Sequence, residues 1–358
     1  MKIAILSMQQ VKNYGSFLQA FSLKNIIEAM GHTCDFINIV PGRQLDGYRI
    51  GRFYKLELLC KRLWGRHFVK RLKTIYKFQS RFAKEFLPYL GVKPGVNANR
   101  YDIVVIGSDE VFNCAQKAWF GFSPQLFGHG LNADKVITYA ASFGSTTSEK
   151  LQALGIKDEV AGYLKDISSL SVRDKNSFDT VKELTGKEPL MNVDPVLIFD
   201  YGKFMPVNVG LTDYMIVYTY PGRITDMDEI AAIRRLARSK GLKIVSIGHY
   251  FSWCDAVVVP TPFEVLAYFR DAAYIVTDTF HGSVFSIKYN KLFCTIVREM
   301  NSNKLTFLLR QFGLEGRIAS CAADICRIIE CPIDYACVNN MIETERKRAL
   351  DYLGSELK

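Results

Sequence analysis

Apolar runs typical of buried strands alternate with helical patterns along almost the whole chain. The first run, Lys2–Leu6, precedes a helical pattern that begins near Ser16 and ends at Gly31. The same order recurs after the runs Tyr101–Ile106 and 272–276. Because a helix that connects two strands brings them together in parallel, this alternation predicts an α/β protein with mostly parallel sheets.

A turn-rich segment divides the alternation into two halves of similar architecture. Residues 200–213 carry two glycines and a proline, which favour a linker. A chain of 358 residues is also long for a single hydrophobic core. We therefore expect a first domain at 1–200, a second at 201–335, and a helix within 336–358 that packs back on the first domain. The opening strand–helix–strand unit lacks the motif G-x-G-x-x-G, so dinucleotide binding is poorly supported.

The net positive charge of the chain is confined to one segment. The formal charge is +10, and residues 43–86 hold thirteen lysines and arginines against three acids, so the rest of the chain is neutral. Apolar residues recur at helical spacing in 43–90, which predicts a basic helical insertion in the first domain. These basic side chains have two interpretations. They form the solvated face of an ordinary helical hairpin, or they form a surface that binds anionic lipid headgroups or a diphosphate-linked acceptor. Nucleic acid is a weaker interpretation, since no short DNA- or RNA-binding motif occurs.

The remaining composition is that of an ordinary globular protein, with 49% hydrophobic and 23% charged residues. No apolar run approaches the ~18 residues that a membrane span needs. The amino terminus lacks the pattern of a signal peptide, so we expect a cytoplasmic protein. The nine cysteines are scattered and form no CxxC pair, which argues against metal clusters and disulfides.

Polar turns follow the predicted strands at their carboxyl ends in both halves. In α/β sheets this is the edge at which ligands bind. If the two sheets face each other, the turns line one cleft. They are residues 13–16, 108–110, 142–144, 173–174 and 279–283.

His281 lies between a buried strand and a helix that Gly282 and Ser283 open. Backbone N–H groups and the helix dipole attract anions to such a position. An imidazole there can donate to a phosphate or transfer a proton near neutral pH. The alternative is a core histidine beside a tight-turn glycine.

Two charged residues of the first half are further candidates. Arg173 is the best anion ligand, because a guanidinium binds carboxylate or phosphate through two parallel bonds. The alternative is that it pairs with Asp174 or with a helix end. Asp109 follows the clearest strand and can accept a proton from a hydroxyl group, or else it caps the next helix.

The turn after the first strand offers donors to an anion. Gly15 lets the backbone approach closely, while Asn13 and Ser16 contribute N–H and hydroxyl groups. The alternative is that these residues form the N-cap of the first helix. Lys304 follows the last predicted strand and can add positive charge, although a structural role is favoured.

Read together, these turns resemble those of the polysaccharide pyruvyl transferase family. The matching stretches occur in the same order over nearly the whole chain, and 43–90 is the least covered part. They are NYGSFLQAFSLKNIIEAMGH, YDIVVIGSDEVFN, VITYAASFG, SVRDKNSF with NVDPVLI, and VTDTFHGSVFSIKYNKLF.

The resemblance implies a GT-B-like pair of Rossmann-like domains with a cleft between them. It implies phosphoenolpyruvate as donor, a pair of sugar hydroxyls as acceptor, and a pyruvate ketal with released phosphate as products. We expect a hexose such as galactose, modified as a 4,6-ketal, in a bacterial surface or capsular polysaccharide precursor linked to polyprenyl diphosphate. The chemistry needs no metal and no organic cofactor, since phosphoenolpyruvate is a co-substrate.

By the same resemblance, Arg173 and His281 match positions that hold the donor. The remaining expected donor ligands are Asn13, Gly15, Ser16, Ser142, Thr279, Gly282, Ser283 and Lys304, and the expected acceptor ligands are Ser108, Asp109 and Glu110. The chain departs from the family pattern at three positions: Thr279, where many members carry arginine, Phe112, which is the aromatic of GSDxxW, and Glu110, where glutamine is frequent. Lys304 and Arg298 are the candidates to replace the missing arginine.

These roles give a hypothesis for the reaction and two alternatives to it. His281 is the general acid or phosphate ligand, Arg173 binds the donor's carboxylate or phosphate, and Asp109 is the base on the acceptor. A nucleotide-sugar glycosyltransferase would share the two-domain architecture. A non-catalytic polyanion-binding protein would share the basic character.

Overall fold

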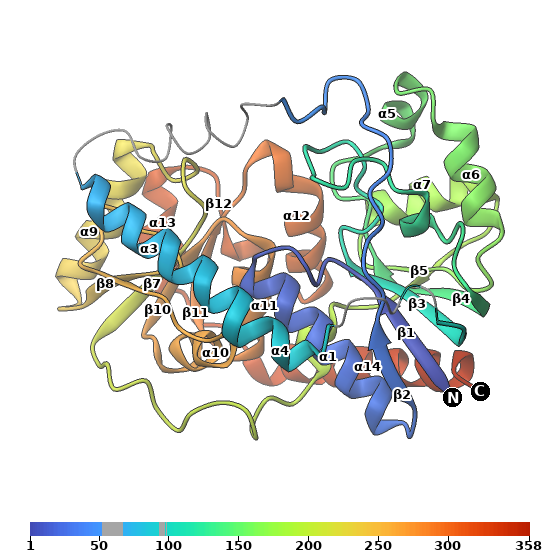
Figure 1. The fold of residues 1–358 in the computed structure, drawn as a ribbon. Coiled ribbons are helices and arrows are strands. Elements are labelled where there is room, and N and C mark those ends of the chain that lie inside the picture. Colours follow the sequence, from blue (N-terminus) through green and yellow to red (C-terminus); the bar gives the residue numbers. More distant parts are fainter. Residues whose placement is uncertain (52–66, 93–96, 98) are drawn as a thin grey trace. The chain divides into compact units, whose positions relative to one another are not determined.

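The chain forms two compact units in the computed structural model, which describes residues 1–51, 67–92, 97 and 99–358. The described part of the first unit consists of 1–51, 87–92, 97, 99–199 and 343–358. The second unit contains 67–86 and 200–342. Each unit holds one six-stranded sheet (Figure 1).

The sheet of the first unit is parallel throughout, in the order β2-β1-β3-β4-β5-β6. Its strands are β1 (Lys2–Leu6), β2 (Thr33–Phe36), β3 (Tyr101–Asp109), β4 (Ala133–Ala141), β5 (Ser171–Val172) and β6 (Leu190–Met191). Its helices are α1 (Tyr14–Ala29), α4 (Leu87–Leu90), η3 (Pro124–Phe127), α5 (Ser148–Ala153), α6 (Lys157–Lys165), α7 (Lys175–Thr185) and α8 (Pro195–Ile198). Phe112 is fully buried in the core, with its ring centroid 5.1 Å from that of Phe127 and 5.0 Å from that of Phe143.

The sheet of the second unit is also parallel, in the order β12-β11-β10-β7-β8-β9. Its strands are β7 (Tyr214–Tyr218), β8 (Lys243–Ile247), β9 (Ala256–Val258), β10 (Tyr274–Thr277), β11 (Leu292–Ile296) and β12 (Ile318–Ala319). Its helices are α3 (Phe68–Arg81), η1 (Phe82–Phe86), α9 (Met227–Ser239), α10 (Pro262–Asp271), α11 (Phe280–Lys288), η4 (Glu299–Asn301), α12 (Ser302–Gln311), η5 (Glu315–Arg317) and α13 (Ala322–Glu330). The two sheets with their helices confirm the predicted pair of Rossmann-like units.

Each sheet has one point at which the order of the strands reverses. In the first sheet the chain proceeds from β1 to β2 on one side and then crosses to β3 on the other. In the second it proceeds from β7 through β8 to β9 and then returns to β10, beside β7. Open parallel sheets bind ligands at the carboxyl ends of the strands that flank such a reversal. The loops after β1 and β3, and those after β7 and β10, are therefore the places to look for a site.

The basic segment 43–90 is divided between the units rather than inserted into the first. Helix α3 belongs to the second unit, because its inner face packs on the loops after β8 and β9. The Phe78 ring lies 6.3 Å from that of His249, and the Arg81 guanidinium donates to the carbonyl of Val259. Leu90 belongs to the first unit, where its carbonyl accepts a hydrogen bond from Lys24. The helical pattern predicted within 52–66 lies outside the described residues.

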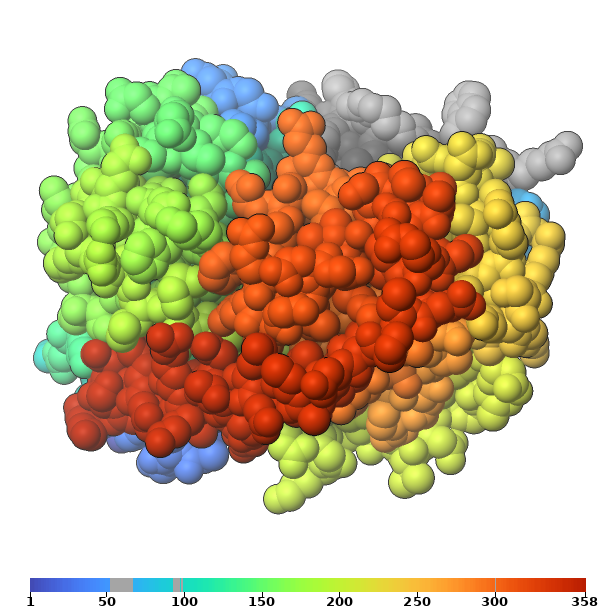
Figure 2. All heavy atoms as spheres, turned by 180° about the vertical axis from the view of Figure 1, so that it is seen from behind, coloured from blue at the N-terminus to red at the C-terminus, as the bar shows by residue number. Residues whose placement is uncertain are grey.

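Helix α14 (Tyr335–Glu356) begins in the second unit and ends in the first. In the first unit the Tyr352 hydroxyl donates to the carbonyl of Thr138 in β4 at 2.7 Å, and burial raises the pKa of this phenol. Lys135 Nζ lies 2.7 Å from a carboxylate oxygen of Glu356. The outer side of α14, dark red in Figure 2, is exposed.

Local details of the sequence set the bounds of several elements. Residues 148–165 form two helices rather than one, because Gly155 adopts a positive φ of 66° between α5 and α6. Asp226 is the N-cap of α9, where its side chain accepts from the amides of Asp228 and Glu229. Strand β2 ends at Phe36. No described helix is long and apolar enough to span a bilayer.

Candidate active site

The first unit brings the turn after β1 together with the end of β3, on either side of the strand reversal. The Ser16 hydroxyl, in the first turn of α1, donates to Asp109 Oδ2 at 2.7 Å. Asn13 is the N-cap of α1, where its side-chain oxygen accepts from the amide of Gly15 at 2.7 Å. The alternative interpretation of Asn13 as a cap is therefore correct. Ser16 instead connects α1 to the candidate base.

Asp109 lies in a sharply bent end of β3 rather than at a helix cap. Its φ is 80°, and the preceding Gly107 has a φ of 118° and a cis peptide bond to Ser108. A side chain at Gly107 would collide with the carbonyl oxygen of Tyr139, 2.2 Å from the position of its Cβ. Ser108 is fully buried, and its hydroxyl donates to Gln19 Oε1 at 2.8 Å. The Ser108 side chain thus bonds the end of β3 to α1.

Arg173 is held between two aspartates in the interior of the first unit. Its guanidinium donates to Asp109 Oδ1 at 3.0 Å and to Asp194 Oδ2 at 2.7 Å, and only 2% of its side chain is exposed. Burial opposes the charge of Arg173, but the two carboxylates outweigh it, so the pKa of the guanidinium is raised. An anionic ligand that reached Arg173 would have to share it with both aspartates. Neither partner is the one that the sequence suggested.

Asp174 and Ser142 brace the turns on either side of Arg173. Asp174 is the N-cap of α7 and accepts from the amide and the hydroxyl of Ser177. Its other oxygen accepts from the Ser142 hydroxyl at 2.6 Å, and that hydroxyl accepts in turn from the amide of Gly144. Both side chains are buried and satisfied within the unit. The structure therefore gives Ser142 an internal role.

Glu110 is half-buried and points into the turn after β4. Its Oε2 accepts from the side-chain amide of Asn113 at 2.7 Å. Gly144 has a φ of 57°, and a Cβ there would lie 2.5 Å from Glu110 Oε2. The contact between Glu110 and Gly144 shows that the turns after β3 and β4 are packed tightly together.

The second unit places Thr279, His281, Gly282 and Ser283 at the amino end of α11. Thr279 is the N-cap, and its hydroxyl accepts from the amide of Gly282 at 3.0 Å. A Cβ at Gly282 would lie 2.1 Å from Thr277 Oγ1, so only glycine fits. The Ser283 hydroxyl donates to the carbonyl of Thr279. These contacts pack the start of α11 against the end of β10.

His281 is buried, with 8% of its surface exposed. Its ring contacts Phe280 edge-on at 5.4 Å between centroids and Phe285 at 6.0 Å. Two aromatic rings thus fix the orientation of the imidazole. His281 lies in the second unit, whereas Asp109 and Arg173 lie in the first.

The two cations expected to replace the family arginine differ in their surroundings. Arg298 donates to both carboxylate oxygens of Glu229, at 2.9 and 2.6 Å, so its guanidinium is already engaged. The Glu229 bond raises the pKa of Arg298. Lys304 is half-buried in the first turn of α12.

Three charged residues at these edges were not singled out from the sequence. Asp194 follows β6 and completes the Arg173 cluster. Asp278 follows β10 directly, and Arg223 follows β7; the Arg223 guanidinium lies 3.4 Å from the carbonyl oxygen of Asp278. Asp194 and Asp278 could have been identified as site residues from the sequence, because both lie at the carboxyl ends of predicted strands. Within the described part of the chain, no group of three or more His, Cys, Asp or Glu could hold a metal ion.

Comparison with known families gives one match. The model of the family "Polysaccharide pyruvyl transferase" matches residues 13–299, which include both clusters described above. Among curated proteins, no sequence matches the chain.

Solved structures resemble the chain only distantly. S. aureus MnaA with UDP is 11% identical, with a TM-score of 0.49 over 99% of this chain and 96% of that one. A putative UDP-N-acetylglucosamine 2-epimerase from Listeria monocytogenes is 8% identical, with a TM-score of 0.49 over 98% and 90%. A Thermobaculum terrenum O-GlcNAc transferase mutant is 13% identical, with a TM-score of 0.42; the match covers 99% of this chain and 64% of that one.

Proposed function

The chain belongs to the polysaccharide pyruvyl transferase family, and we propose that it transfers the pyruvate group of phosphoenolpyruvate to two hydroxyls of one sugar. The observation that carries the proposal is the position of Asp109, Arg173 and His281. Asp109 is the last residue of β3, Arg173 follows β5 directly, and His281 lies at the start of the helix after β10; β3 and β10 each flank a reversal of strand order. The family match spans all three residues.

The reaction joins one donor to a diol and releases phosphate. A proton is added to the methylene carbon of phosphoenolpyruvate, and the central carbon gains the positive character that a sugar oxygen attacks. The bond from that carbon to the phosphate oxygen then breaks, and phosphate leaves with the electron pair. The second hydroxyl attacks the same carbon and closes the ketal. Of the two hydroxyl protons released, one balances the proton added to the methylene carbon and the other leaves with phosphate.

His281 is assigned as the acid that supplies this proton or as a ligand of the phosphate. Its buried position between Phe280 and Phe285 supports this role, because a fixed ring orientation directs a proton to one atom. The loops proposed to bind the donor are stabilised by contacts inside each unit, made by Ser142, Thr279, Gly282 and Ser283. Lys304 is proposed as a further ligand of the donor.

Asp109 is assigned as the base that accepts a proton from the sugar, with Glu110 beside it. Asp109 accepts from Ser16 through one oxygen and from Arg173 through the other. Arg173 is assigned as the ligand of the donor carboxylate. Because Asp109 and Asp194 already hold it, its position is set before the donor binds.

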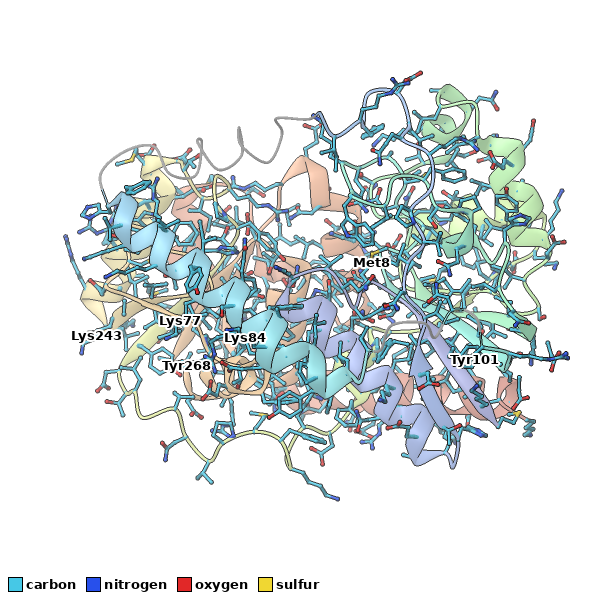
Figure 3. The ribbon with its side chains drawn as sticks, in the orientation of Figure 1. Met8, Lys77, Lys84, Tyr101, Lys243 and Tyr268 are labelled. Atoms are coloured by element: carbon cyan, nitrogen blue, oxygen red, sulfur yellow. The ribbon has the colours of Figure 1, made fainter. Side chains whose placement is uncertain are left out.

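The acceptor is proposed to be a hexose such as galactose, modified at its 4- and 6-hydroxyls within a surface polysaccharide precursor on a polyprenyl diphosphate. The outer face of α3 supports a membrane-associated acceptor. Val69, Leu72 and Tyr76 recur at helical spacing on that face and are 57%, 39% and 71% exposed. The exposed lysines Lys70 and Lys73 lie between them in the chain, and Lys77 and Lys84, labelled in Figure 3, follow. Apolar side chains flanked by lysines are typical of helices that lie on anionic bilayers.

Phosphate release tests the reaction. Purified protein is incubated with phosphoenolpyruvate and a panel of galactose-containing lipid-linked acceptors, and both phosphate and a new ketal methyl signal are measured. Acceptor-dependent formation of both supports the proposal. Release of nucleotide from a nucleotide sugar, without consumption of phosphoenolpyruvate, would identify a glycosyltransferase instead.

Flotation with vesicles tests the membrane surface separately. The chain should float with vesicles of anionic lipid at low salt, and Lys77→Glu should reduce the bound fraction. Lys243→Glu, on an exposed residue of β8, is the matched control (Figure 3). Equal flotation of the wild-type chain with neutral and anionic vesicles, or no flotation at all, would contradict an anionic-membrane surface.

A further inference from the structure

The strand reversal of the second sheet holds charged residues that the proposed mechanism does not yet use. Strands β7 and β10 pair in parallel there, with Tyr218 opposite Thr277. The loop after β7 carries Arg223, and β10 is followed at once by Asp278. The two loops touch, because Arg223 donates to the carbonyl of Asp278 at 3.4 Å. This is the position at which such sheets bind ligands.

Asp278 is a fully buried acid whose carboxylate oxygens make no hydrogen bond to a described residue, although the Thr219 hydroxyl and the Arg223 and Arg298 guanidinium groups lie near enough to affect its charge. None of its surface is exposed, and neither carboxylate oxygen accepts a hydrogen bond from a residue that the structure describes. Its backbone, by contrast, is held by Asn301, which donates to the carbonyl at 2.7 Å. Buried polar groups are nearly always hydrogen-bonded, so an unsatisfied one calls for a partner that binds there.

Arg223 is a cation without a carboxylate partner in the described part of the chain. It is half-buried, and its guanidinium lies 4.7 Å from the centre of the Tyr220 ring, which orients it. Among the residues that the structure describes, its guanidinium donates a hydrogen bond to a backbone carbonyl, that of Asp278. Arg298, on the other side, is engaged by Glu229 through two bonds. Arg223 is therefore the cation at this edge that a ligand can recruit.

We propose that Arg223 and Asp278 form the binding site for the phosphate group of the donor, in which Arg223 supplies positive charge and the protonated carboxyl of Asp278 donates a hydrogen bond. The identity of the donor rests on the proposed function, whereas the anion site itself rests on the geometry above. In the chain, Asp278 lies two residues before the start of α11 and three residues before His281.

The surroundings of Asp278 favour its protonated form. Burial raises the pKa of Asp278, while the Thr219 hydroxyl and the guanidinium groups of Arg223 and Arg298 act in the opposite direction. Glu229 offsets the charge of Arg298. An arriving phosphate adds a further negative charge beside Asp278, which raises its pKa again. Anion binding and protonation of Asp278 therefore reinforce each other.

Titration calorimetry of the full chain with phosphoenolpyruvate and with inorganic phosphate tests the contribution of Arg223. Arg223→Gln should weaken both affinities by about tenfold or more, since a charge-assisted bond is lost. Arg223→Lys should recover part of the loss because the charge remains. Arg235→Gln, on the exposed face of α9, is the matched control and should bind as the wild-type chain does. Equal affinity of Arg223→Gln and the control would overturn the proposal.

The affinity for sulfate, measured at several pH values, tests the role of Asp278, because the charge of sulfate does not change over the pH range in which a carboxyl group with a raised pKa titrates. Wild-type affinity should fall as the pH rises through the pKa of Asp278. Asp278→Asn keeps a neutral hydrogen-bond donor and should bind with affinity that no longer depends on pH in that range. An unaltered pH dependence in Asp278→Asn would contradict the assignment. Thermal melting of each variant confirms that it is folded.

The two proposals fail in different ways. If the wild-type chain consumes phosphoenolpyruvate but Arg223→Gln leaves its KM unchanged, the anion site is wrong and the function stands. If phosphate binds through Arg223 but no acceptor releases phosphate from phosphoenolpyruvate, the anion site stands and the function is wrong.

Discussion

The two candidate clusters differ in whether their charges are already paired. In the first unit, Arg173 is held by Asp109 and Asp194, and Ser16 bonds the same Asp109. In the second, the carboxyl of Asp278 has no hydrogen-bond partner among the described residues, and Arg223 bonds only a backbone carbonyl. A paired cluster contributes to folding and holds a fixed geometry, whereas an unpaired one costs stability that a ligand can restore. The comparison predicts that substitutions in the first cluster lower stability as well as activity, whereas those in the second affect binding with little loss of stability.

The largest expected effect is the loss of Arg173. Arg173→Ala leaves two buried aspartates without their cation and should lower the free energy of unfolding by about 3–5 kcal/mol, measured by urea denaturation. Arg223→Gln removes no ion pair and should change it by less than about 0.5 kcal/mol. Similar losses in the two variants would remove the distinction between the clusters.

The second effect concerns turnover. His281→Gln removes the proposed acid while keeping a polar side chain of similar size, and should lower acceptor-dependent phosphate release at least about a hundredfold. Lys187→Gln, on an exposed residue of the first unit, is the control. Turnover of His281→Gln near the wild-type value would rule out a role for the imidazole in proton transfer.

The third effect concerns the packing at the start of α11. Gly282→Ala places a methyl group 2.1 Å from the Thr277 hydroxyl oxygen, so the N-terminal turn has to shift. We expect a loss of about 1–3 kcal/mol in the free energy of unfolding. Gly354→Ala, in α14, meets nothing within 4 Å and serves as the matched control. A melting temperature of Gly282→Ala equal to that of the control would show that the turn is not tightly packed.

The smallest expected effect is on the pH dependence of stability. The pKa of Asp278 is raised in the folded chain, so the folded state holds this proton more tightly than the unfolded state. Stability is therefore lost as the pH rises from the unfolded to the folded pKa of Asp278. Asp278→Asn has no carboxyl proton to lose. The difference in the free energy of unfolding between the variant and the wild-type chain should therefore move in favour of the variant as the pH rises from acid pH to pH 7. A difference between the two that does not vary with pH would contradict a raised pKa.

The fold was predictable from the sequence because its strands are continuous apolar runs. The run at 2–6 coincides with β1, and the run at 101–106 begins where β3 begins, although β3 continues to Asp109. The assignment of α3 to the second unit was not predictable, because only tertiary contacts such as Arg81 with Val259 reveal which sheet it joins. Two-residue strands such as β12 are too short to leave a periodic signal.

The positions of the candidate site were predicted better than its bonds. Turns at the carboxyl ends of strands identified Asp109, Arg173 and His281 as chemically plausible groups. The pairing of Arg173 with Asp194 joins residues 21 apart, and that with Asp109 joins residues 64 apart. Such pairings depend on strand order. Arg223 was missed for the same reason, since the crossing from β9 back to β10 is what brings it beside Asp278.

One measurement tests the pyruvyl transferase proposal most directly. Phosphoenolpyruvate is supplied with a galactose-containing lipid-linked acceptor, and phosphate release and the ketal methyl signal are followed together in the wild-type chain and in His281→Gln. We expect one phosphate per ketal in the wild-type chain and at least about a hundredfold slower formation of both in the variant. Phosphate release without a ketal, or no consumption of phosphoenolpyruvate with any acceptor that carries a suitable pair of hydroxyls, would contradict pyruvyl transfer.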